Sequence, residues 1–83
     1  MNDPRVRPLS RVPPGRSATV VALAGGRAFQ SRLVSMGLNV GCGVTVIRSS
    51  NPSGGPTLIA MGGTRLAIGY GMAEKIMVSM GPE

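Results

Sequence analysis

The sequence contains no histidine and has three carboxylates, Asp3, Glu74 and Glu83, two of which lie close to the chain ends. General acid–base catalysis usually needs a histidine or a carboxylate held beside a second polar group, and a catalytic nucleophile needs a neighbouring base. The single cysteine, Cys42, has no histidine to activate it. The composition therefore predicts that the chain is not an enzyme.

Metal and cofactor sites are also disfavoured by what is missing. Zinc and iron sites combine several imidazole, thiolate or carboxylate ligands, and this composition does not supply an adequate set within one chain. A phosphate-binding loop requires a lysine and a hydroxyl residue behind its glycines, and these are absent after Gly41 and Gly43. We therefore predict no metal site, no cofactor and no nucleotide site.

Long apolar runs are missing too. The longest apolar stretches, such as residues 18–24, fall far short of the roughly 20 residues that cross a bilayer, and no segment resembles a signal peptide. A single cysteine fits a reducing compartment. With 83 residues and only two aromatic side chains, Phe29 and Tyr70, we expect one small cytoplasmic domain with an aliphatic core.

Basic charge is what the chain has in excess. Eight arginines and one lysine give a net charge of +6, and four of the arginines fall among prolines near the start of the chain. Charge of this kind usually serves solubility, which is the interpretation we favour. Binding to nucleic acid or to another acidic surface is the alternative. The four early arginines are Arg5, Arg7, Arg11 and Arg16.

The expected elements follow from apolar periodicity and from turn residues. Residues 1–8 are too polar and proline-rich to bury apolar surface, so we predict a disordered basic lead-in ahead of one domain at residues 9–83. Phe29, Leu33 and Met36 form one helical stripe within residues 27–36. Short strands are predicted at residues 18–24, 44–48, 57–61, 64–68 and 76–80, with a helical turn at 72–75.

Glycines mark the ends of these elements. Gly37 can take the left-handed conformation just past the helix, which lets Leu38 pack back on Leu33 in a Schellman motif. The pair Gly62-Gly63 fits a two-residue hairpin turn. We therefore assign structural turn or cap roles to Gly15, Gly37, Gly41, Gly62 and Gly63.

Five short strands and one short helix in a chain of this length favour a mainly β fold. A small five-stranded barrel, in which the sheet curls onto itself, removes exposed strand edges. The helix between the first two strands would then plug one open end of the barrel. An OB-fold or an open α+β sheet is the alternative.

Several short motifs occur together in this sequence. They are Leu9, Pro14-Gly15, the strand at Val20, the block from Leu33 to Gly41, Gly55-Pro56, Leu66-Ala67-Ile68 and Ala73-Glu74. Together they resemble the FeoA domain over residues 9–80. The resemblance implies an SH3-like β-barrel and a small cytosolic accessory protein of ferrous-iron uptake. It also implies a partner, the cytosolic G domain of FeoB, the membrane transporter for ferrous iron, which would hold the chain at the inner face of the membrane.

We predict a docking patch for a protein partner at the end of the helix. Met36 and Leu38 would be exposed at that end, and Arg32 would lie on its outer side. The polar loop 49–56 would be mobile and take part in the patch, and Arg65 would add a further contact. In the simpler interpretation Leu38 only caps the helix and Arg32 only solvates it. The main hypothesis is an adaptor that binds and modulates a FeoB-type transporter. A nucleic-acid-binding basic barrel, a detached SH3-like module of a metal-dependent regulator, and a homo-oligomer remain open.

Overall fold

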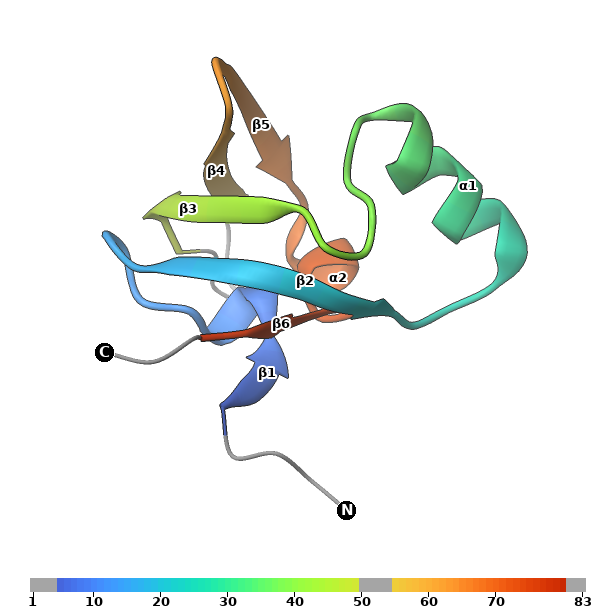
Figure 1. Cartoon of the computed structure of the whole chain (residues 1–83), viewed down its shortest axis with the longest axis horizontal. Coiled ribbons are helices and arrows are strands. Elements are labelled where there is room, and N and C mark those ends of the chain that lie inside the picture. Colours follow the sequence, from blue (N-terminus) through green and yellow to red (C-terminus); the bar gives the residue numbers. More distant parts are fainter. Residues whose placement is uncertain (1–4, 50–54, 81–83) are drawn as a thin grey trace.

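An antiparallel sheet of six strands dominates the structure, a computed structural model that describes residues 5–49 and 55–80. The strands lie in the order β1-β6-β2-β3-β4-β5, and the sheet curves around the core (Figure 1). Within the described residues its edge strands, β1 and β5, do not pair with each other, so the barrel is not closed. In chain order the elements are β1 (Val6–Pro8), the 3-10 helix η1 (Leu9–Arg11), β2 (Ser17–Leu23), α1 (Arg27–Ser35), β3 (Gly43–Arg48), β4 (Thr57–Met61), β5 (Thr64–Ile68), α2 (Tyr70–Ala73) and β6 (Ile76–Ser79).

β1 is the strand that the sequence does not predict. Val6–Pro8 pairs antiparallel with β6, and the N–H of Met80 donates to the carbonyl of Arg5 with 3.0 Å between nitrogen and oxygen. The prediction of disorder is therefore wrong for residues 6–8, while residues 1–4 lie outside the described part of the chain. An edge strand needs few apolar side chains because its backbone hydrogen bonds hold it, and an edge position tolerates Pro8.

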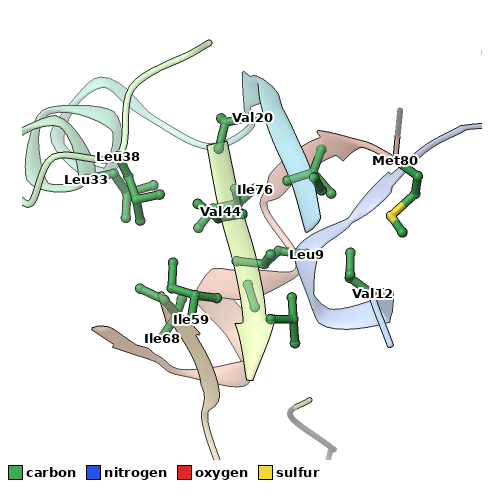
Figure 2. Close-up of a cluster of buried hydrophobic side chains, with 14 residues drawn as sticks. Leu9, Val12, Val20, Leu33, Leu38, Val44, Ile59, Ile68, Ile76 and Met80 are labelled. Carbon is green, nitrogen blue, oxygen red and sulfur yellow. The ribbon is translucent and has the colours of Figure 1, made fainter. Parts of the chain in front are cut away.

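The core is aliphatic, as the shortage of aromatic residues predicts. Buried side chains alternate with more exposed ones along β6 and along the first part of β2 and β3. The register shifts between Val20 and Ala22 and between Val46 and Arg48. The hairpin of β4 and β5 turns at Gly62, which has a φ of 61°, as the first position of a type II′ turn requires. The buried apolar side chains, drawn in Figure 2, are Leu9, Val12, Ala18, Val20, Leu33, Leu38, Val44, Val46, Ile59, Ile68, Ala73, Ile76, Val78 and Met80.

α1 ends just before Gly37, as the sequence predicts. The N–H of Leu38 donates to the carbonyl of Leu33, and the N–H of Gly37 donates to the carbonyl of Val34, each over 2.9 Å. Gly37 has a φ of 95°. These two hydrogen bonds and the left-handed glycine define a Schellman motif. Leu33 and Leu38 are both fully buried and lie together in Figure 2.

α1 does not plug the barrel. It extends beyond the end of β2, away from the sheet (Figure 1), and Leu33 is its one buried residue. The apolar stripe predicted a deeper contact, but Phe29 and Met36 are only partly buried. The enclosed side of the sheet is filled instead by η1 and α2, which contact each other and bury Leu9 and Ala73.

Candidate docking surface

The end of α1 meets the end of β4. Met36 caps the helix, Gly37 follows it, and a Cβ atom at Gly37 would lie 3.3 Å from Cε of Met61, the last residue of β4. Met36 and Met61 are both half-buried and pack against the core. Glycine allows this close approach together with a positive φ, so the local sequence determines how the helix end lies on the hairpin.

Arg32 adds a positive charge beside these methionines. It lies in the last turn of α1, four residues before Met36, so the two side chains are neighbours on the helix surface. Arg32 is exposed, and its carbonyl accepts a 2.7 Å hydrogen bond from Oγ of Ser35. We call Arg32, Met36 and Met61 the helix-end surface. It combines adaptable apolar side chains with one guanidinium group.

Two other predicted contact residues lie elsewhere. Leu38 is fully buried, so the prediction that it is exposed is wrong, because the Schellman turn directs its side chain into the core. Arg65 is exposed and directly follows Thr64, which pairs with Met61. Successive side chains of a strand point to opposite faces, so Arg65 lies on the other face of the hairpin from Met61. In the predicted mobile loop, residues 50–54 are outside the described residues.

Sequence reasoning did not single out two exposed valines near this surface. Val34 is 49% exposed in α1, and Val40 is 62% exposed in the turn that leads to β3. The sequence does indicate that Val34 is exposed, because this residue falls outside the apolar stripe of the helix. It does not indicate the exposure of Val40, which depends on the conformation of the turn around Gly41, where φ is 96°.

The reactive groups in the described part of the chain are few. No cluster of three or more His, Cys, Asp or Glu side chains occurs among the described residues. The half-buried Cys42 donates its thiol hydrogen to the carbonyl of Gly43 over 3.6 Å. A hydrogen bond with Glu74 raises the pKa of Tyr70.

Comparison with known families assigns the fold and the family. The model of the FeoA domain matches residues 7–80 of this chain, from β1 to the residue after β6. The chain belongs to the FeoA family. A relative from Methanocaldococcus jannaschii, named "Putative Fe(2+) transport protein A", is 42% identical over 71 residues, which cover 86% of this chain and 83% of the relative.

Solved structures agree with this assignment. A crystal structure of FeoA, described as an iron uptake regulatory protein, is 44% identical and has a TM-score of 0.77, covering 88% of this chain and 93% of its own. FeoA of Stenotrophomonas maltophilia, solved with zinc and described as a prokaryotic SH3 domain protein, is 28% identical with a TM-score of 0.73, and the match covers 87% of this chain and 88% of its own. The fold is therefore SH3-like.

A likeness to a different class of protein shows the fold alone. A manganese-dependent transcriptional repressor is 18% identical with a TM-score of 0.82, covering 96% of this chain and 44% of its own. This level of identity carries no functional assignment.

Among the residues that the structure describes, the helices are too short or too polar to cross a bilayer.

Proposed function

We propose that the chain is a cytoplasmic, non-catalytic accessory protein of ferrous-iron uptake that binds and modulates a FeoB-type membrane transporter. Two findings support this: the match to the FeoA domain and the identity to a protein named for Fe(2+) transport. The contact that we propose is between the helix-end surface and the cytosolic G domain of the transporter.

The observation that carries this proposal is the close approach of Met61 to Gly37 at the end of α1, where Met36 caps the helix and Arg32 lies in its last turn. The block from Leu33 to Gly41, which contains Met36 and Gly37, is also the part of the sequence that most specifically resembles FeoA. Methionine and arginine are enriched in protein–protein interfaces. Methionine adapts its shape to a partner, and arginine can bind a carboxylate through two hydrogen bonds.

An NMR titration tests this contact. The protein, labelled with ¹³C at its methionine methyl groups, is titrated with the isolated G domain, and the signals of Met36 and Met61 are expected to shift. The signal of Met80, which is buried at the end of β6, should stay in place. No shift at high micromolar concentration would contradict direct binding to this domain.

Charge reversal locates the contact on α1. Arg32→Glu is expected to weaken binding of the G domain by about tenfold, because it replaces an interfacial cation with an anion. Arg27→Glu is the matched control, since Arg27 is exposed on the first turn of the same helix and makes the same change in net charge. Equal losses in the two variants would place the contact somewhere other than the helix-end surface.

Nucleic-acid binding is the second candidate, because the described residues carry nine Arg or Lys side chains and one carboxylate, Glu74. The aromatic groups give it little support. Both rings are half-buried; Nζ of Lys75 lies 5.5 Å from the centre of the Phe29 ring, and Tyr70 is hydrogen-bonded to Glu74. Oligonucleotide binding that is tighter than G-domain binding and falls steeply with salt would favour this candidate.

A further inference from the structure

Two distant segments of the chain meet at the end of the sheet farthest from α1. The N–H of Val46 donates to the carbonyl of Arg16 over 2.9 Å. Oγ of Ser49 donates to the carbonyl of Val12 over 2.8 Å. The segment that follows η1 and the end of β3 therefore lie side by side, where β2 begins and β3 ends (Figure 1).

This junction gathers positive charge. Arg11 ends η1, Arg16 precedes β2 and Arg48 ends β3. We call these three arginines the basic end. Arg11 and Arg48 are exposed, and Arg16 is half-buried.

The basic end lies where β2 begins, and α1 follows the far end of this strand (Figure 1). β2 has seven residues and a strand rises about 3.3 Å per residue, so roughly 20 Å separates the start of β2 from its end. A ligand bound at the basic end therefore leaves α1 accessible.

We propose that the basic end binds the anionic headgroups of a phospholipid bilayer, with α1 pointing away from the membrane. Guanidinium groups form paired hydrogen bonds with phosphate oxygens, and an anionic leaflet attracts clustered arginines. Glu74 is the one carboxylate that offsets the nine cations of the described residues. The proposal does not depend on the transporter contact.

Charge and shape favour a bilayer over the other occupants of this surface. A second copy of the chain carries the same excess of cations and would be repelled. Single-stranded nucleic acid is held largely by aromatic stacking, and the two rings of this chain, Phe29 and Tyr70, are half-buried. A bilayer requires neither an opposing carboxylate nor a stacking ring, because its headgroups present many phosphates to a few arginines.

Vesicle co-sedimentation of the full chain tests the proposal. Vesicles of phosphatidylcholine with phosphatidylglycerol are expected to bind the protein, more weakly as salt rises, whereas phosphatidylcholine alone should not. The double variant R11Q/R48Q should bind at least roughly tenfold more weakly, since each arginine near an anionic leaflet contributes substantially to binding. The control R27Q/R65Q removes two exposed cations outside the basic end and should lose less than about threefold.

Three results would overturn the proposal. The first is no binding to the anionic vesicles at low salt. The second is an equal loss in R11Q/R48Q and R27Q/R65Q, which would show that only net charge matters. The third is displacement of the vesicles by duplex DNA at equal phosphate concentration, which would assign the surface to nucleic acid. Circular dichroism checks the fold, and if the double variant unfolds, the single variants R11Q and R48Q should each bind about threefold more weakly.

Discussion

The helix-end surface and the basic end are different kinds of surface. At the helix end, Met61 lies against Gly37, and the geometry depends on a helix cap and on the core. At the basic end, arginines lie on two segments that are joined by backbone and hydroxyl hydrogen bonds. A shaped apolar surface can discriminate between protein partners, whereas a basic surface attracts anions of many kinds. Substitutions at the helix end should therefore cost stability, and those at the basic end should cost little.

The largest effect is expected from Leu33→Ala. Leu33 is fully buried and is the residue that anchors α1 to the core, so its truncation should lower the free energy of unfolding by about 3 kcal/mol. Val34→Ala is the matched control on the same helix; it is 49% exposed and should change stability by less than about 0.5 kcal/mol. Urea denaturation measures both. Similar losses in the two variants would mean that α1 is not held through Leu33.

A smaller loss is expected from Gly37→Ala. The φ of 95° is unfavourable for any residue with a Cβ, and the new methyl group would lie 3.3 Å from Cε of Met61. The flexible end of Met61 can move, so the expected loss in unfolding free energy is about 1–2 kcal/mol. Gly43→Ala is the control, because nothing lies within 4 Å of a Cβ atom there and its φ is not positive. Equal stability of the two variants would contradict the role of Gly37 as the helix cap.

Deletion of residues 1–8 tests whether β1 belongs to the domain. Because this removes the pairing of β1 with β6, we expect a loss of about 1 kcal/mol in unfolding free energy. Hydrogen exchange at the N–H of Met80 should accelerate, since its partner, the carbonyl of Arg5, is gone. Exchange at the N–H of Val46, which is bonded to Arg16, should not change. Unchanged exchange at Met80 would mean that the first residues contribute nothing to the fold.

The helix end could be predicted from the sequence because its signals are local. Gly37 and the pattern before it are sufficient to place the helix stop, and Arg32 and Met36 follow from it. Met61 was missed as part of the surface, because its contact with Gly37 joins residues far apart in the chain. The exposure of Leu38 was predicted wrongly, since the same cap that ends the helix buries its side chain.

The basic end could not be predicted from the sequence, because it joins residues that are far apart in the chain. Residues 6–8 look disordered in isolation, and their order comes from pairing with β6, about seventy residues later. Arg11 and Arg48 are brought to one junction by the contact between Val12 and Ser49, which no local pattern records. Composition revealed the excess of arginine, but only the topology of the sheet shows which arginines share a surface.

The smallest effect on stability is expected from R11Q/R48Q. Both side chains are exposed, and the substitution removes two of several like charges, so it should leave the free energy of unfolding within about 0.5 kcal/mol of the parent or raise it slightly. Added salt should stabilise the parent more than the variant, because the repulsion that salt screens is already reduced in the variant. Thermal unfolding at low and high salt, with R27Q/R65Q as the control, measures this difference. A loss above about 1 kcal/mol would show that these arginines hold the fold together, and the helix-end surface and the basic end would then differ less than their side chains indicate.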